Sequence, residues 1–223
     1  MVLRKRHTPP SNDHSAAGND DGCPSRRPTT KKRKICVVED PVSFVFHEFN
    51  ANDCDTNEIV EETNHRFIEP TPKMIEAYPE TSRAVRDLDL TKLKELHKAG
   101  VPMLCCNKFG DSLVSIAARR GATNIVKFLV DEVKTTVFLR DDTQRTVLHD
   151  ALWTAEPNFD VVETLLKVAP ELCLLKDKRG ATPFDYIRPD HTKQWMDWLD
   201  KHRSLLQPKN TTAKKNSKNP AAA

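Results

Sequence analysis

The stretch DDTQRTVLHDALWTAEPNFDVVETLL, residues 141–166, contains a helix start, a break and a second helix start. Thr146 precedes an apolar helical pattern, and its hydroxyl can accept a hydrogen bond from a first-turn N–H that otherwise has no partner. A proline and an asparagine interrupt the pattern within residues 155–160. Apolar residues then return at the spacing of a helix face, namely Val161, Val162, Leu165 and Leu166. The stretch therefore predicts two short antiparallel helices.

The same pattern recurs at a nearly fixed interval, which is typical of repeat proteins. The hydroxyl residues that precede the first helix of three successive units, Ser112, Thr146 and Thr182, are 34 and 36 residues apart. Upstream, an apolar run within residues 84–100 lies 33 residues before an equivalent run within residues 117–133. Four units in register are therefore predicted.

These units resemble ankyrin repeats. Residues 177–185, DKRGATPFD, are similar to the D-x-x-G-x-T-P-L-H opening of that family, and residues 145–151, RTVLHDA, to its middle. Residues 107–121, NKFGDSLVSIAARRG, match the same opening and the A-A-x-x-G that closes the first helix. The resemblance spans about residues 79–206. It implies an all-α solenoid of helix-turn-helix units joined by short hairpin loops.

The predicted ankyrin-repeat domain occupies residues 73–206, and its first and last units depart most from the family pattern. A single helix pair has too little core of its own, so each unit must pack on its neighbours. After Pro189, we expect Asp190 to cap a final helix whose Trp195 and Trp198 close the last core, the alternative being a partner site at an exposed edge of Trp198. The expected repeats are about 79–106, 107–140, 141–176 and 177–206.

The segments outside this domain are predicted to be mainly unstructured. Residues 1–40 and 207–223 are polar, carry a net charge of +4 each and cannot bury enough apolar area to offset the cost of ordering, which predicts disordered basic tails. Residues 41–72 carry a net charge of −6 and predict an acidic linker that is ordered at most in part. Its residues 42–46 alternate like a short strand. Three roles are possible for residues 41–72: a docking motif, a segment folded back on the repeats, or a spacer.

Composition and cysteine spacing exclude several classes of protein. No apolar run approaches the 18 or more residues of a membrane span, and the first residues lack the apolar core of a secretory signal. The six cysteines include no C-x-x-C, and no paired His completes a zinc spacing. We therefore expect an intracellular protein with free thiols and without a metal or cofactor. Cys105 is expected to fill a packing position of the hairpin.

The sequence does not indicate an enzyme. His149–Asp150 is an adjacent His/Asp pair in the repeat region, and no nucleophile elbow or phosphate-binding glycine loop accompanies it. In the family this histidine bridges backbone groups of neighbouring hairpins, so the resemblance implies a structural role for His149.

Binding to another protein is the function that remains, and the resemblance implies where it occurs. In ankyrin repeats the variable residues project from the hairpin tips and inner helices into one concave face. Trp153 has the composition of a binding hot spot, unless the two-residue insertion around residues 156–158 folds over it and buries it. The basic residues among the candidates favour an acidic peptide or protein segment as the ligand. The candidate partner-binding residues are Lys108, Phe109, Asp111, Arg119, Arg120, Asp142, Thr143, Arg145, Trp153, Thr154, Lys178 and Arg179.

A basic cluster, Lys31, Lys32, Arg33 and Lys34, resembles a nuclear localisation signal. The expected function is a non-enzymatic scaffold, monomeric and without membrane contact, that acts as a nuclear regulatory adaptor. A nuclear location is favoured over a cytoplasmic one. The alternative is a nucleic-acid- or chromatin-associated factor that binds weakly through its basic tails. The charge blocks also raise the hypothesis that the acidic residues 48–69 cover the basic face in cis.

Overall fold

The computed structural model describes residues 40–52 and 54–207, all within the larger of two compact units, residues 37–223. The predicted tails and the basic cluster at residues 31–34 therefore lie outside the described residues or at their edge. The α-helices of the described part are α1 (Pro41–Ala51), α2 (Thr56–Asn64), α3 (Pro72–Arg86), α4 (Leu90–Lys98), α5 (Leu113–Arg119), α6 (Thr123–Lys127), α7 (Val147–Leu152), α8 (Phe159–Val168) and α9 (Thr192–Lys201). Shorter helical turns are η1 (Phe128–Glu132), η2 (Pro170–Leu174), η3 (Pro183–Tyr186), η4 (Pro189–His191) and η5 (Arg203–Leu206).

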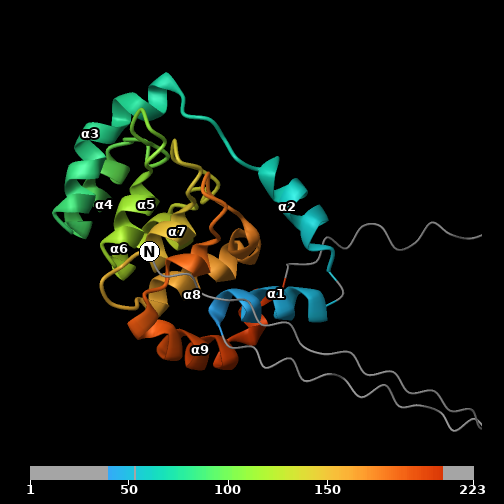
Figure 1. The fold of residues 1–223 in the computed structure, drawn as a ribbon. Helices are drawn as coiled ribbons and strands as arrows, with labels where there is room; N and C mark the ends of the chain where they lie inside the picture. The colour runs from blue at the N-terminus through green and yellow to red at the C-terminus, as the bar shows by residue number, and fades with distance from the viewer. Residues whose placement is uncertain (1–39, 53, 208–223) are drawn as a thin grey trace, which may run out of the picture. The chain divides into compact units, whose positions relative to one another are not determined.

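The helices form two stacked rows, which confirms the predicted all-α repeat fold (Figure 1). The inner row consists of α3, α5, α7 and η3, each in contact with the next, and α6 contacts α8 in the outer row. Leu93, Leu129 and Leu165, one from each of three successive outer helices or their extensions, are fully buried in a single core cluster. Neighbouring units therefore share one core, as expected of a solenoid.

The inner helices α5 and α7 and the turn η3 each begin at a local cap that the sequence predicts. The Ser112 hydroxyl accepts a hydrogen bond from the N–H of Ser115 at 3.1 Å. Thr146 N–H donates to Nδ1 of His149 at 3.0 Å, and Thr182 N–H donates to the Asp185 carboxylate at 2.7 Å, in the reciprocal arrangement of a capping box. These caps satisfy first-turn N–H groups that would otherwise be unpaired.

Backbone hydrogen bonds tie each hairpin to its neighbour. Asp142 N–H donates to the Phe109 carbonyl at 2.8 Å, and Lys178 N–H donates to the Thr143 carbonyl at 3.0 Å. Gly110 makes this approach possible, since it has φ of +83° and a Cβ there would lie 2.2 Å from the Arg140 carbonyl oxygen.

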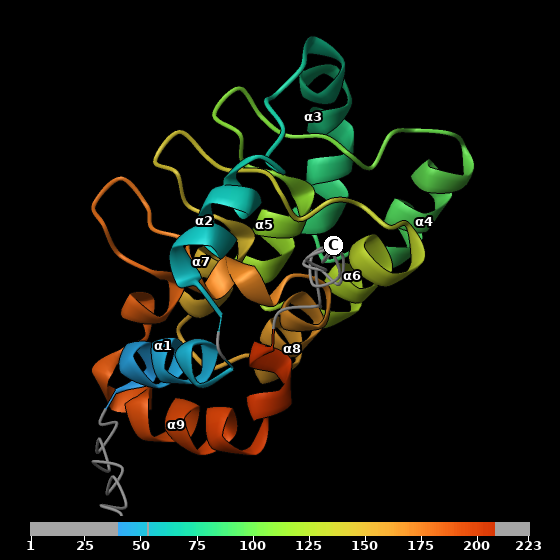
Figure 2. The same ribbon diagram turned by 90° about the vertical axis from the view of Figure 1, so that its right-hand side faces the viewer.

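The expectation of a strand-like alternation at residues 42–46 is wrong, because these residues lie in α1. The Asp40 carboxylate caps this helix by accepting from Ser43 N–H at 2.9 Å, and Pro41 occupies its first turn. The side chains of Phe44, Val45 and Phe49 are buried, at helical rather than alternating spacing. α1 packs on α9, and the two helices lie side by side in both ribbon views (Figures 1 and 2).

Residues 54–72 are also folded, in contrast to the linker expected for residues 41–72. α2 contacts η2, and Arg66 forms an ion pair with Glu171 and lies 3.7 Å above the ring of Phe138. Arg140 in turn lies 4.0 Å from the ring centroid of Phe67. These contacts involve Phe138, Arg140 and Glu171, which lie between an outer helix and the next hairpin. They do not involve Arg119 or Arg145. This counts against the hypothesis that the acidic residues 48–69 cover the basic face.

Two element boundaries differ from expectation. α3 runs through Pro79, so the predicted start of the first repeat at about residue 79 lies inside a longer helix that begins at Pro72. Asp190 lies in the turn η4, and α9 follows without a side-chain cap, so Asp190 is not the cap of the last helix. The aromatic closure is confirmed: Trp195 and Trp198 are buried, with ring centroids 5.6 Å apart. In the described part of the chain, no helix has the length and apolar character needed to cross a bilayer.

Candidate partner-binding face

The three hairpin tips share one geometry, set by a side chain that folds back on its own turn. The Asp141 carboxylate accepts from the N–H groups of Thr143 at 2.9 Å and Arg145 at 2.8 Å. Asn107 and Asp177 make the same pair of hydrogen bonds in their own hairpins. The residues at the tips are thereby held on a rigid support. We call the surface formed by these tips and by the exposed residues of α5 and α7 the inner face.

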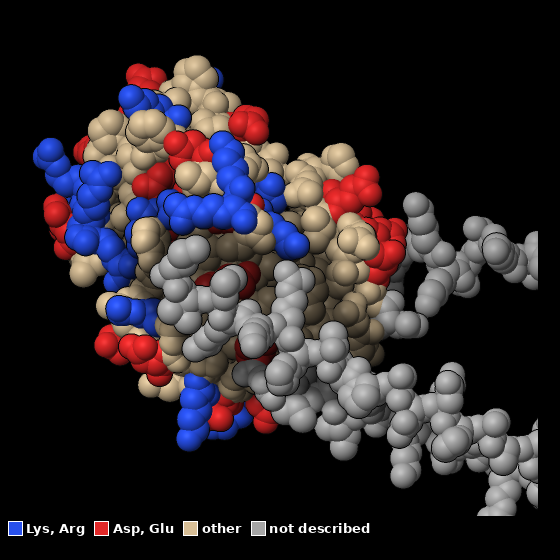
Figure 3. Space-filling model, viewed as in Figure 1, with Lys and Arg blue, Asp and Glu red and all other residues tan. Residues whose placement is uncertain are grey.

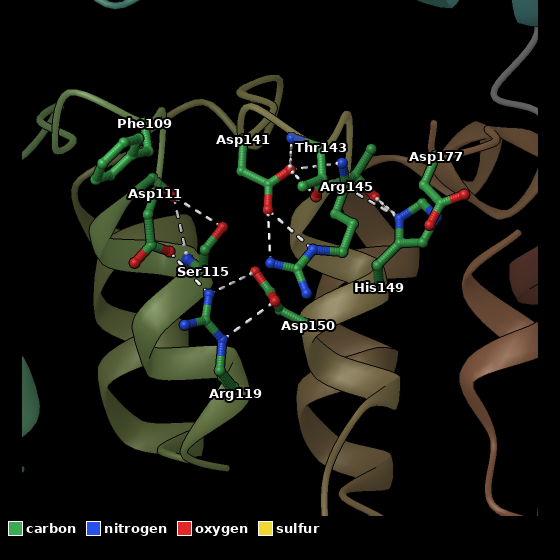
Figure 4. Close-up of polar contacts among 12 residues, drawn as sticks. Phe109, Asp111, Ser115, Arg119, Asp141, Thr143, Arg145, His149, Asp150 and Asp177 are labelled. Carbon is green, nitrogen blue, oxygen red and sulfur yellow. Dashed lines mark hydrogen bonds and ion pairs between the residues drawn. The ribbon is translucent and has the colours of Figure 1, made fainter. Parts of the chain in front are cut away.

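Arg119 is a bridge between two repeats. Its guanidinium donates to both oxygens of Asp150, at 3.1 and 3.2 Å, and to Asp111 at 2.9 Å (Figure 4). Asp150 comes from the next inner helix and is only 3% exposed. Burial raises the pKa of Asp150, and Arg119 opposes this effect. Burial by itself would lower the pKa of Arg119, but its hydrogen bonds to Asp150 outweigh this and raise it. Arg119 therefore belongs to the scaffold, together with Asp111.

Arg145 has a double role. Its Nε and Nη2 donate to the Asp141 carboxylate at 2.9 and 2.7 Å, which holds it beside the hairpin (Figure 4). Its guanidinium carbon also lies 5.2 Å from the ring centroid of Trp153. Trp153 is 54% exposed, so the insertion after it does not bury it. The Tyr186 ring meets it edge-on with centroids 6.2 Å apart.

Tyr186 is a residue of this face that the sequence did not single out. Its hydroxyl donates to Asp177 at 2.6 Å, and its ring also packs edge-on against His149 at 5.4 Å. His149 Nε2 lies 3.2 Å from the Ala181 carbonyl oxygen, which is the predicted bridge between hairpins. Tyr186 is the last residue of η3, the short turn that takes the place of an inner helix in the last repeat. The only feature of the sequence that could have pointed to it is its position directly after the capping residue Asp185.

The remaining candidates divide into exposed and internally bonded side chains. Phe109 is 51% exposed, with the Lys108 ammonium 4.9 Å from its ring centroid. Arg120 is exposed, but its Nε donates to the Arg86 carbonyl at 3.2 Å. The hydroxyl of Thr154 donates to the Glu156 carbonyl at 2.7 Å and so faces the loop. Four further tip residues are exposed: Asp142, Thr143, Lys178 and Arg179.

The positive charge that the inner face offers to a ligand is smaller than the number of its Lys and Arg residues suggests. Lys and Arg side chains gather over α5 and α7, with acidic residues among them (Figure 3). Arg119 and Arg145 are neutralised by scaffold carboxylates. Within the described ranges, no carboxylate lies within 4.0 Å of the charged nitrogens of Lys108, Lys178 or Arg179. The charge that a ligand can use is therefore at these tips and at Arg120, which is exposed and makes no ion pair among the described residues.

The hydrogen bonds of Asp141 predict a pH-dependent contribution to stability. Burial would raise the pKa of Asp141, but hydrogen bonds from Thr143 and Arg145 outweigh it and lower the pKa below its ordinary value of 3.8. The stabilisation is therefore present above about pH 4 and lost as the pH falls through the folded-state pKa. We expect Asp141→Asn to lower the free energy of unfolding by about 1 to 2 kcal/mol at pH 7 and by less at pH 3. Urea unfolding at both pH values measures this, and an equal loss at both would contradict it.

The fold defines a helical-repeat protein, and several candidate residues of the inner face are exposed. Residues 82–175 match the family model for ankyrin repeats, in three copies. This region therefore consists of ankyrin repeats, which are modules for protein–protein interaction and are typically not enzymes.

Among similar solved structures is that of the Bd0816 predatory endopeptidase from Bdellovibrio bacteriovorus in complex with the immunity protein Bd3460. The match has 26% sequence identity and a TM-score of 0.44, and it covers 56% of this chain. It spans 65% of the other chain, just under two thirds. None of the curated proteins compared with this chain matches it.

Proposed function

We propose that this protein is an adaptor that binds a partner protein on the inner face, with Trp153 as the central contact. The observation that carries the proposal is the exposure of Trp153, 54%, between residues that hold it in place. Arg145 lies over its ring and Tyr186 packs on its edge. A large apolar side chain that is already ordered before binding loses little conformational entropy in a complex, and tryptophan is enriched among hot spots.

We further propose that the partner contributes an acidic segment. Lys108, Lys178 and Arg179 are exposed on two hairpin tips without a carboxylate partner among the described residues. Charges at the rim of an interface mainly speed association and select partners, and salt weakens their effect. Arg119 and Arg145 contribute to this face by shape rather than by free charge.

The test is an affinity capture from cell extract that compares matched variants of the full chain. Trp153→Ala is expected to lower the recovery of specific partners about tenfold or more, as for a hot-spot residue. The double variant Lys178→Ala/Arg179→Ala should lower the recovery less than Trp153→Ala does. Its effect should be larger at low salt than at high salt. The control Lys127→Ala/Lys167→Ala removes two exposed cations from the outer helices α6 and α8 and should leave recovery unchanged.

Two outcomes of this capture would count against the proposal. The first is equal recovery by the parent chain and Trp153→Ala. The second is loss of partners only when residues 1–36 and 208–223 are deleted, which would favour the nucleic-acid or chromatin alternative. Nuclease treatment of the extract separates these cases, because partners held through nucleic acid would be released.

We also propose that the adaptor works in the nucleus, on the basis of the sequence cluster Lys31, Lys32, Arg33 and Lys34. A fluorescent fusion of residues 1–40 is expected to accumulate in the nucleus. Changing the four cations to alanine should abolish the accumulation. An equal nuclear signal from both fusions would remove the basis for this proposal.

A further inference from the structure

The N-terminal helix α1 covers the opposite end of the repeat array from the one that it leads into. The chain continues from α1 through α2 to α3, the first inner helix, yet α1 itself packs on α9, η3 and η5 at the last repeat (Figures 1 and 2). Each of these three elements has a buried apolar side chain in the same core cluster as Phe44, Val45 and Phe49, namely Leu199, Phe184 and Leu206. α1 therefore covers apolar surface that the last repeat would otherwise expose to water.

The contacts of α1 have the character of a bound helix. Phe44, Val45 and Phe49 are buried on one side of α1, at most 5% exposed. Glu48, between them along the same helix, forms an ion pair with Arg203, whose guanidinium also lies 4.6 Å from the ring centroid of Phe44. The contacts of α1 therefore follow a simple sequence pattern. It consists of two aromatic residues five positions apart, Phe44 and Phe49, and a carboxylate directly before the second, Glu48.

The repeats have a link that α1 lacks. Successive hairpins are joined by a backbone hydrogen bond, as from Asp142 N–H to the Phe109 carbonyl, whereas the described helices of the array, like α1, pack on one another through side chains. Among the described residues, no backbone hydrogen bond joins residues 40–52 to the array, and the ion pair of Glu48 is their one charged link to it. An amphipathic helix that binds through side chains alone is a common mode of peptide recognition.

From this geometry we propose that α1 is an intramolecular ligand, and that the surface of α9, η3 and η5 is a docking site for an amphipathic helix of a partner protein. The partner helix carries apolar residues at i, i+1 and i+5, at least two of them aromatic, and a carboxylate at i+4 that pairs with Arg203. Such a helix displaces α1, which its tether holds near the site at an effective concentration of about millimolar. The site adjoins the inner face at η3, which carries Tyr186, but the proposal does not rest on the function of Trp153.

A peptide of residues 39–52, carrying a fluorescent label, is the probe for this site. In the full chain, Phe44→Asp/Phe49→Asp is expected to release α1 and leave the site open. The labelled peptide should then bind this opened chain at least about tenfold more tightly than the unaltered chain, where α1 competes. Fluorescence anisotropy measures both affinities. Equal affinities, or loss of the helical circular dichroism of the opened chain, would overturn the proposal.

A charge exchange tests the site specifically. Adding Arg203→Glu to the opened chain should weaken the peptide several-fold, and a peptide with Glu48→Lys should recover that loss. A Glu48→Lys peptide that binds the Arg203→Glu chain no better than the original peptide does would overturn the proposal.

Hydrogen exchange on the unaltered full chain provides a measurement that needs no variant. Because α1 is inferred to leave while the array stays folded, its amides should exchange at least about tenfold faster than those of α5 and α7. Equal protection of α1, α5 and α7 would show that α1 opens only with the whole array, and would contradict its role as a ligand.

Discussion

Replacing Arg119 by alanine should lower the free energy of unfolding by about 3 kcal/mol. The change leaves the Asp150 carboxylate, 3% exposed, without the guanidinium that bonds both of its oxygens. Removing one partner of a buried ion pair costs about 3 to 5 kcal/mol, and the lower end applies because the Arg119 side chain is 36% exposed. Chemical denaturation of the purified chain measures the effect.

Arg120→Ala is the matched control, because the neighbouring side chain is exposed and makes no ion pair among the described residues. It should change stability by no more than about 0.5 kcal/mol. The double variant Arg119→Ala/Asp150→Asn should be more stable than Arg119→Ala alone, since the stranded charge is gone. If Arg119→Ala were as stable as the parent, the bridge between the second and third repeats would not be structural.

Leu129→Ala is expected to have a comparable or larger effect, about 2 to 5 kcal/mol. Leu129 is fully buried in the shared core, so its removal leaves a cavity between repeats as well as losing apolar burial. Because each unit is stabilised by its neighbours, the loss should destabilise the whole array rather than one unit.

The control for this cavity is Leu88→Ala, which removes the same atoms from a side chain that is 55% exposed. Its unfolding midpoint in urea should stay close to that of the parent. Equal midpoints for Leu129→Ala and Leu88→Ala would show that the outer helices do not share a core.

The repeat fold is predictable because it is encoded in short-range patterns. The caps at Ser112, Thr146 and Thr182 each join residues three positions apart, so their spacing is visible in the sequence. The apolar faces around Leu129 and Leu165 repeat at the same period. Local and global preferences agree in this region, as is usual for well-folded sequences.

The N-terminal segment could not be predicted in the same way. Residues 42–46 fit a period of two, whereas the buried residues Phe44, Val45 and Phe49 have helical spacing. The cap by Asp40 and the proline after it favour the helix. The surface on which this helix packs, however, is far away in the sequence: Glu48 pairs with Arg203, 155 residues later. A contact so distant in the sequence leaves no periodic signal.

The site was predicted in part, for a similar reason. Trp153 stood out as a large aromatic residue on an inner helix, and the structure shows it exposed. Arg119 pairs with Asp150, 31 residues later in the sequence, and this pairing is not visible in the sequence. Arg119 was therefore predicted to be a cation available to a partner, whereas it is part of the scaffold. A carboxylate in a short helix whose other residues are Val, Leu, Ala and the capping His149, as at Asp150, is the signal that could have indicated the pair.

Site-specific photo-crosslinking tests the central claim, that a protein partner docks on the inner face, most directly. A photoreactive phenylalanine analogue is placed in the full chain at Trp153, at Phe109, or at Val168, a 37% exposed residue of α8 that serves as the control. We predict that positions 153 and 109 capture the same protein and that position 168 does not. Capture of that protein from position 168 alone, with none from 153 or 109, would contradict the account.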